Sequence, residues 1–381
     1  MRRLEGCYLQ STGNIDWNLV IIISVSKIMY PVLLKTTLRK QNSQTNKRMI
    51  MRTYRLLYLC ITVFLCAKIE VSAFPLRDSK MQASQDASTE NKMGLYYFEL
   101  KDYSQAIYHF KKAADEGYAS AQYNLGYCHE LGYGIDKNWD IAIVWYNKAA
   151  NQGYAPAQNR IGYLYKYGMG TDRDLSSAMK WYKSAANQGY AEAQTNLGDC
   201  YLFEEGVTNY TQAIEWYRKA ASQGYAEAEN KLGYCYQMGY GVEQNYTQAV
   251  EWYRKAASHE SEKAYNNLGY CYEYGIGVKQ DIETAIMWYS KAANQKMSLA
   301  LTNLGAIYYN GRGVSQNYKK AVEYFEKAAE LGDPNGLYNL GYCYEHGYGV
   351  EVDIELAIEK YSLGALLGSN EAQEALSRLQ R

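Results

Sequence analysis

Apolar positions recur along most of this chain with a step of 36 residues. One marker is a Trp-Tyr pair, which begins at Trp145, Trp181, Trp216, Trp252 and Trp288. A single step of 35 separates Trp181 from Trp216. The second marker is Leu or Ile followed by Gly, which begins at Leu125, Ile161, Leu197, Leu232, Leu268, Leu304 and Leu340. A period of this length, kept over roughly 290 residues, predicts a repeat solenoid whose units pack on their neighbours.

The pattern within one unit predicts two helices. Residues 264–274 carry Leu268, Cys271 and Tyr272 at helical spacing, and Gly275 to Val278 interrupt the pattern. Asp281 then stands where a helix N-cap is expected, because its carboxylate can accept bonds from free backbone N–H groups. The second helix follows with apolar residues on one face, and its alanines allow closely packed helix crossings.

Two kinds of departure from the regular unit are expected to change local turns. Glu260 and Lys296 stand where other second helices end at Gly, so we expect these two turns to differ. In the fourth unit Glu204 replaces the first Gly of the inter-helix loop, and one residue is missing before Trp216. We expect this loop to be tighter and less regular than the others.

The motifs resemble a known repeat family. Leu268-Gly269-x2-Tyr272 followed by Ala285-x3-Tyr289 is similar to the tetratricopeptide pattern, and the inserted Gly-x-Gly-Val loop resembles the Sel-1-like repeat (SLR) variant. The resemblance covers residues 92–381. It implies an all-α fold, a right-handed α/α superhelical solenoid of about eight helix-pair repeats. Asn370 to Gln380 are expected to form a C-terminal cap helix, which covers apolar surface on the last unit.

The residues before this pattern carry an apolar run from Leu56 to Ala67. Arginines precede the run and small residues follow it up to Ala73, which is the order of a secretory signal. Twelve residues are too few to cross a bilayer core, which needs about 20. We therefore expect 1–50 to be an extension or mis-called start, 51–73 a signal peptide or signal anchor, and 74–91 a flexible polar lead-in.

The expected location follows from this segment. A cleaved signal places the protein in the secretory pathway, either secreted or in the lumen of the endoplasmic reticulum. An uncleaved segment 56–67 would anchor it in a membrane, and a spurious signal would leave it cytoplasmic.

The net charge of the chain changes sign at Ala73, the end of the expected signal segment. Up to Ala73 there are 11 Lys and Arg residues against 3 Asp and Glu, a net charge of +8. Because the whole chain is neutral, the remainder carries −8 and has no basic stripe. Nucleic-acid binding needs clustered Lys and Arg, so this class of partner is not expected.

The cysteines of the repeat region predict free thiols. Each stands three residues after the Leu of a unit, namely Cys128, Cys200, Cys235, Cys271 and Cys343. Equivalent helices of adjacent units lie about 10 Å apart or more, beyond the roughly 7 Å Cα separation that a disulfide tolerates. We expect them to be small buried apolar residues.

Two sequons offer possible glycosylation sites, Asn209-Tyr210-Thr211 and Asn245-Tyr246-Thr247. Each Asn also occupies the N-cap position of its unit, which alone accounts for an Asn there. Both interpretations stay open.

Motifs that could support catalysis are weak. Ser177-x-x-Lys180 matches the nucleophile motif of serine β-lactamases, but its Ser-Asp-Asn and Lys-Thr-Gly partners are missing. The four histidines occupy unrelated repeat positions without paired metal-ligand spacing. The Gly-x-Gly loops follow helices rather than strands, unlike phosphate loops. We expect no catalytic residue, no metal and no cofactor.

The resemblance implies that first helices line the concave face. Two rows of residues should then look inward. The tyrosine row stands two residues after the Leu of each unit and comprises Tyr127, Tyr163, Tyr234, Tyr270 and Tyr342. The asparagine row stands one residue before it and comprises Asn124, Asn196, Asn267, Asn303 and Asn339. Tyr gives rigid apolar area with a polar tip, and Asn can donate and accept, so both suit peptide binding.

We therefore expect a non-catalytic scaffold or adaptor that binds a protein or peptide on its concave face. Within the binding class, the alternatives are an adaptor in quality control at the endoplasmic reticulum and a cytosolic regulator of cell-wall synthesis or signalling. A β-lactamase-like hydrolase acting through Ser177 is the alternative from the enzyme class. A competing interpretation of the tyrosine row is that it packs between successive first helices.

Overall fold

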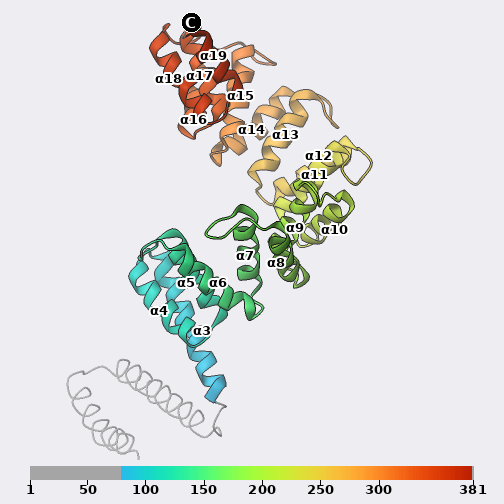
Figure 1. The fold of residues 1–381 in the computed structure, drawn as a ribbon. Helices are drawn as coiled ribbons and strands as arrows, with labels where there is room; N and C mark the ends of the chain where they lie inside the picture. Colours follow the sequence, from blue (N-terminus) through green and yellow to red (C-terminus); the bar gives the residue numbers. More distant parts are fainter. Residues whose placement is uncertain (1–78, 380–381) are drawn as a thin grey trace, which may run out of the picture. The chain divides into compact units, whose positions relative to one another are not determined.

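The structure, a computed structural model, describes residues 79–379, which contain seventeen helices and no strand. The predicted extension (1–50) and signal segment (51–73) lie outside these residues. Figure 1 shows the helices, whose bounds are α3 (Ser79–Glu99), α4 (Tyr103–Asp115), α5 (Ala119–Leu131), α6 (Trp139–Asn151), α7 (Ala155–Tyr167), α8 (Leu175–Asn187), α9 (Ala191–Phe203), α10 (Tyr210–Ala221), α11 (Ala226–Met238), α12 (Tyr246–Ser258), α13 (Glu262–Tyr274), α14 (Ile282–Asn294), α15 (Ser298–Asn310), α16 (Tyr318–Glu330), α17 (Pro334–His346), α18 (Ile354–Leu366) and α19 (Asn370–Leu379).

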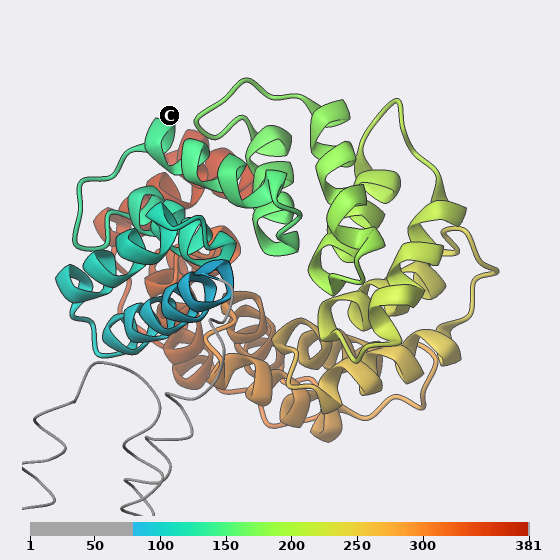
Figure 2. The same cartoon turned by 90° about the horizontal axis from the view of Figure 1, so that it is seen from below.

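Residues 83–381 form one compact unit in which each helix packs on its neighbours in sequence. The odd-numbered helices α3 to α17 are the first helices of eight units, and the even-numbered helices α4 to α18 are the second helices. Contacts are most extensive within a pair and next most extensive between a second helix and the following first helix. Figure 2 shows this succession of pairs in chain order. The predicted all-α solenoid of eight helix-pair repeats is confirmed.

The ends of the solenoid differ in how well the sequence predicted them. The cap helix is confirmed as α19, and it buries Ala372 and Ala375. At the other end, the first unit begins earlier than expected. Helix α3 starts at Ser79, and Ala87 and Asn91 are buried. Residues 79–91 of the predicted flexible lead-in are therefore helical, since the polar composition concealed a helix that has one buried side.

The Leu-Gly marker has a steric cause. In the second to eighth units the Gly lies beneath an aromatic ring of the same unit's second helix. A Cβ added to Gly162 would lie 2.7 Å from the ring of Tyr182, and one added to Gly269 would lie 2.6 Å from that of Tyr289. Both rings are almost completely buried. Only Gly lets the two helices of a unit approach this closely.

The second helices begin at side-chain caps. Asp281, for example, accepts a hydrogen bond from the amide N of Thr284 at 3.1 Å, as the N-cap prediction requires. The predicted difference at the two turns without Gly is wrong. Glu260 and Lys296 adopt left-handed backbone with φ of 60° and 63°, as Gly189 does with φ of 89°. Packing of the flanking helices holds the turn in place although the residue has a Cβ.

The five cysteines of the described residues are free and buried. Burial raises the pKa of the Cys128, Cys235, Cys271 and Cys343 thiols to about 12 and that of Cys200 to about 11. The thiols therefore behave as small apolar groups of the core.

The fourth unit departs from the others, as expected. Glu204 follows α9 in extended backbone with φ of −89° and ψ of 127°, where six of the other first helices end at a left-handed Gly. Its carboxylate pairs with two cations of the preceding unit, Lys166 Nζ at 3.4 Å and Arg173 Nη2 at 2.8 Å. These ion pairs hold the start of the loop to α10 against the preceding unit, and the loop takes a different path from the others.

Candidate functional site

The tyrosine row is half-buried. Four of its members are partly covered, and Tyr270 is 41% exposed. Aromatic rings from the same unit and from the preceding unit pack against the row. The ring of Tyr342 lies 6.0 Å from Tyr348 in its own loop and 6.4 Å from Tyr309 of the preceding unit. Tyr234 contacts Tyr240 and Phe203 in the same way. Tyr234 and Tyr342 therefore each pack between two units and remain partly exposed.

The asparagine row has a structural role that the sequence prediction did not include. The side-chain N of Asn267 donates to Oδ1 of Asn230 in the preceding unit at 2.9 Å, and Asn303 donates to Asn266 at 3.1 Å. The same bond joins Asn124 to Asn91 and Asn196 to Asn159.

Each of these bonds uses one of the two N–H donors of the amide, so peptide binding by the row stays a prediction. Four of the five amide groups already donate across a junction between units. The fifth member of the row is Asn339. The unit before it carries Thr302 at the position where other units carry the accepting Asn. Within the described residues, the buried Thr302 hydroxyl has no hydrogen-bond partner.

The two basic residues at positions equivalent to the asparagine row are neutralised. Arg160 donates through Nε to the buried carboxylate of Glu130 at 2.8 Å, and that carboxylate also accepts from the Tyr146 hydroxyl at 2.6 Å. Lys231 Nζ lies 3.1 Å from Asp199. Neither cation is therefore positioned to hold a free peptide carboxylate.

A second apolar row was missed by the sequence analysis. The last residue of most first helices is large, apolar and exposed, and we name Leu131, Tyr167, Phe203, Met238 and Tyr274 the helix-end row. Tyr167 and Tyr274 are 55% and 50% exposed, more than Tyr270 of the tyrosine row.

The two rows form one surface. Tyr163 and Tyr167 are four residues apart on α7, and their ring centroids lie 4.6 Å apart. Tyr270 and Tyr274 repeat this pair on α13 at 4.7 Å. Residues i and i+4 share a helix face, so the helix-end row extends the tyrosine row by one turn. This spacing was the signal in the sequence that could have revealed it.

The candidate nucleophile caps a helix. The Ser177 hydroxyl donates to Oδ2 of Asp174 at 2.6 Å, and the Ser177 amide N donates to Oδ1 at 3.0 Å. These two bonds lower the pKa of the Asp174 carboxyl. Ser177 is thus part of the N-cap of α8.

The structure was also searched for metal sites and membrane spans. No group of three His, Cys, Asp or Glu side chains in residues 79–379 could hold a metal ion. Within the same residues, every helix is too short or too polar to cross a membrane.

Both sequon asparagines are exposed N-caps. Oδ1 of Asn209 accepts from the Gln212 amide N at 3.1 Å, and Oδ1 of Asn245 accepts from Gln248 at 3.0 Å. The capping bond uses the side-chain oxygen, so the side-chain nitrogen that carries a glycan stays free in each case.

Comparison with known proteins gives a family model that covers most of the chain. The Sel1 repeat model matches eight consecutive segments, residues 88–118, 119–154, 155–190, 191–225, 226–261, 262–297, 298–333 and 334–369.

Two solved structures resemble the chain over most of its length. A protective antigen present in uropathogenic Escherichia coli strains, which displays an SLR fold, is 36% identical with a TM-score of 0.56 and covers 80% of this chain and 67% of its own. A Sel1 repeat protein from Oxalobacter formigenes is 30% identical with a TM-score of 0.59 and covers 81% of this chain and 98% of its own.

Among curated proteins, the chain is similar to DAP3-binding cell death enhancer 1 of Mus musculus. The two are 36% identical over 74 residues, which is 18% of this chain and 14% of the mouse protein. The chain thus spans only a small part of this curated relative.

Proposed function

Because the chain belongs to the Sel1 repeat family, whose solenoids generally bind proteins or peptides, we propose that it is a non-catalytic scaffold that holds a protein partner on one defined face. That face is the concave surface of the first helices, formed by the tyrosine row and the helix-end row. The observation that carries the proposal is the exposure of a large apolar side chain at the same position of five successive first helices.

The physical reason is the cost of exposing such side chains to water. Single exposed apolar residues are ordinary on a protein surface, but a contiguous series of them marks an interaction site. Tyr and Phe are enriched at interfaces because they bury a large rigid area and lose little conformational entropy. Repetition along the solenoid fits a partner segment that contacts several units in turn.

The test changes the two most exposed tyrosines of the face together. Tyr167→Ser with Tyr274→Ser should abolish capture of the partner by the full chain. The free energy of unfolding should fall by about 1–2 kcal/mol, because about half of each side chain is covered and the Tyr274 hydroxyl accepts a hydrogen bond from Nη1 of Arg312 at 2.9 Å. A photo-crosslinker at position 274, used in cells with mass-spectrometric identification, defines the partner before the variant is tested.

The matched control is Tyr108→Ser on the second helix α4, since Tyr108 is 61% exposed and lies off the proposed face. This control should leave capture unchanged. Undiminished capture by the double variant would show that the partner binds elsewhere.

A further inference from the structure

Six of the inter-helix loops pack closely against the preceding unit. A Cβ on the second Gly of each loop would come within 3.0 Å of the first residue of the preceding second helix. Gly170, for example, lies against Trp139 at the start of α6, and Gly313 lies against Ile282 at the start of α14. These loops thereby cover the beginning of the preceding helix.

The loop of the fourth unit does not make this contact. Gly206 occupies the equivalent place, and a Cβ there would meet no atom within 4 Å. The residue that lacks this loop contact is Leu175, the first residue of α8, whose side chain is partly buried. Two features distinguish this loop: Glu204 forms ion pairs with Arg173 and Lys166, and the loop is one residue shorter than the others.

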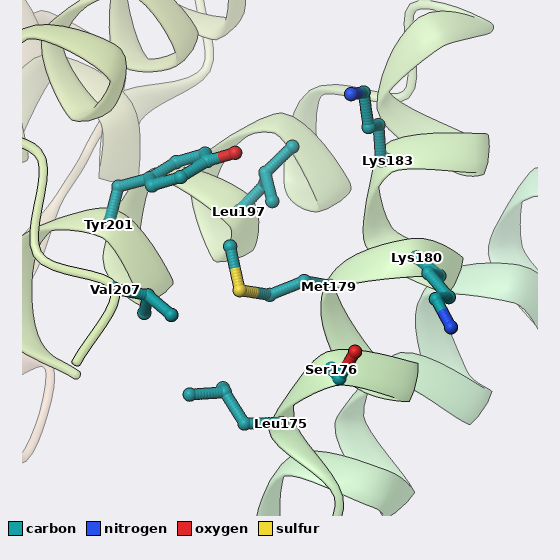
Figure 3. Close-up of a pocket in the computed structure, with 8 residues that line it drawn as sticks. All are labelled: Leu175, Ser176, Met179, Lys180, Lys183, Leu197, Tyr201 and Val207. Atoms are coloured by element: carbon teal, nitrogen blue, oxygen red, sulfur yellow. The ribbon is translucent and has the colours of Figure 1, made fainter. Parts of the chain in front are cut away.

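A cavity of about 340 Å³ lies between α8, α9 and Val207 of this loop. Figure 3 shows that Met179 reaches from α8 toward Leu197 of α9, with Leu175, Tyr201 and Val207 around it. These five side chains form an apolar lining. We name this cavity the junction pocket, and its volume is at the lower end of the range of about 300–1,000 Å³ for ligand pockets. It therefore suits an anchoring side chain better than a large cofactor.

The remaining lining residues Ser176, Lys180 and Lys183 are exposed and lie along α8. The ammonium group of neither lysine forms a hydrogen bond or a close ion pair with another residue of the described chain, apart from a weak attraction of Lys180 to Asp174.

Comparison with the other units shows that this pair of free cations is unusual. The residue equivalent to Lys183 is Arg218 in the fourth unit, and it donates to the Tyr236 hydroxyl of the next unit at 3.2 Å. The position of Lys180 holds Glu in four other units, at Glu215, Glu251, Glu323 and Glu359. The junction pocket therefore has a local positive edge in a repeat region of net charge −8.

We propose that the junction pocket is a specificity site for a segment of a partner protein that carries an apolar anchor beside acidic residues. The anchor, a side chain such as Leu or Phe, fills the apolar space between α8, α9 and Val207. The adjacent carboxylates pair with Lys180 and Lys183. On the other side, an adjoining hollow is lined by Leu175, Arg173, Glu204 and Glu205, and Arg173 pairs with Glu204 there. The inference goes beyond the proposed function because the pocket shares no residue with the tyrosine row or the helix-end row.

The first experiment measures binding of three fluorescein-labelled peptides to the full chain by fluorescence anisotropy. The probes are Asp-Asp-Leu-Phe-Gly-Ser-Gly, its basic counterpart Lys-Lys-Leu-Phe-Gly-Ser-Gly and its polar counterpart Asp-Asp-Ser-Ser-Gly-Ser-Gly. We expect the first to bind at least about tenfold more tightly than the other two, a difference of about 1.4 kcal/mol. The NMR signal of the ¹³C-labelled Met179 methyl group should shift only with that peptide.

Two variants of the full chain separate the pocket from other surfaces. Lys180→Glu with Lys183→Glu alters only exposed side chains and should weaken the first peptide about tenfold or more. Replacing Glu204–Thr208 with the regular loop Gly239–Gln244 should abolish binding while leaving the α8 lining residues unchanged.

Several results would overturn the proposal. Equal binding of all three peptides, or of wild type and the charge-reversed variant, would do so. A shift of the Met179 signal by decanoate but not by the acidic peptide would assign the pocket to small amphiphilic carboxylates instead. The double variant Tyr167→Ser with Tyr274→Ser should bind the peptide normally, so failure of the proposed function would be seen separately.

Discussion

At the scale of single residues, the sequence predicted where residues lie in the helices better than it predicted which contacts they make. The Leu-Gly marker located every unit, and the structure supplies its cause in the ring that covers each Gly, as Tyr289 covers Gly269. The asparagine row was also placed on the first helices. Its bonds could not be foreseen, because Asn267 bonds to Asn230 of the preceding unit, at a position one residue earlier in the repeat. The sequence pattern of a single unit does not show which of its residues lies opposite which residue of the next unit.

The left-handed turns give a prediction at this scale. Lys296→Gly should raise the free energy of unfolding by about 0.5–1 kcal/mol. Left-handed backbone costs a residue with a Cβ about 1–2 kcal/mol, and the larger entropy loss of Gly offsets part of that gain. The measurement is the midpoint of urea unfolding. Gly189→Lys is the reverse control, because a Cβ there meets no atom within 4 Å and only the backbone cost should appear. A lower midpoint for Lys296→Gly would contradict the idea of backbone strain.

At the scale of helices, both elements of each unit and their caps were predicted from spacing alone. The fourth loop was expected to be irregular, but its direction depends on Glu204 meeting Arg173 and Lys166, which come from another unit. Sequence therefore located the irregularity and not the cavity that results from it. The cysteines were predicted as buried residues of the first helices, and their burial has a consequence for stability.

Stability should fall as the pH rises above about 8.5. A thiol in the unfolded chain has a pKa near 8.5, whereas burial raises the pKa of Cys271 to about 12 and that of Cys200 to about 11. Between these values the unfolded chain binds fewer protons than the folded chain, so deprotonation favours unfolding. The stabilisation is complete below pH about 8.5 and declines above it.

Urea midpoints measured from pH about 7 to about 10 test this dependence. Cys271→Ala should show a shallower decline than wild type, because one of the five titrating thiols is absent. The buried tyrosines act in the same direction above pH about 10, so the thiol effect is read below that value. A midpoint that is constant up to pH about 10 would contradict the buried-thiol argument.

At the scale of the whole chain, the repeat period predicted a solenoid and its number of units, and the motifs within a unit predicted the fold class and the family. It did not predict where the first unit begins, because α3 is polar on most of its surface and only its buried side belongs to the pattern. The face that binds a partner was predicted only in part. The tyrosine row was located, and the helix-end row was missed because exposure depends on where each helix ends.

Entry into the secretory pathway is a prediction at this scale. If residues 51–73 direct translocation, the full chain made in mammalian cells should carry glycans at Asn209 and Asn245, since both are exposed with a free side-chain nitrogen. Treatment with a peptide N-glycosidase should then increase the mobility of the protein on a gel. The variants Asn209→Asp and Asn245→Asp keep the helix cap and should each remove one glycan.

A version without residues 51–73 is the control and should stay unglycosylated. If the full chain is equally unmodified while a reporter fused to residues 51–80 is secreted, translocation occurs and the two asparagines serve only as caps. A reporter that stays in the cytosol would show that the apolar segment is not a signal.

The packing of Gly beneath Tyr and the bond between asparagines differ in what they join. The first contact, such as Gly233 with Tyr253, lies inside one unit, and the second always spans a junction. A unit exchanged as a block would bring its own intact interior, whereas the bond at each seam would survive only beside a neighbour with a matching asparagine. The seam between Thr302 and Asn339 already lacks that match. The asparagine bond thus restricts which units can be neighbours, whereas the packing of Gly beneath the ring does not depend on the neighbouring unit.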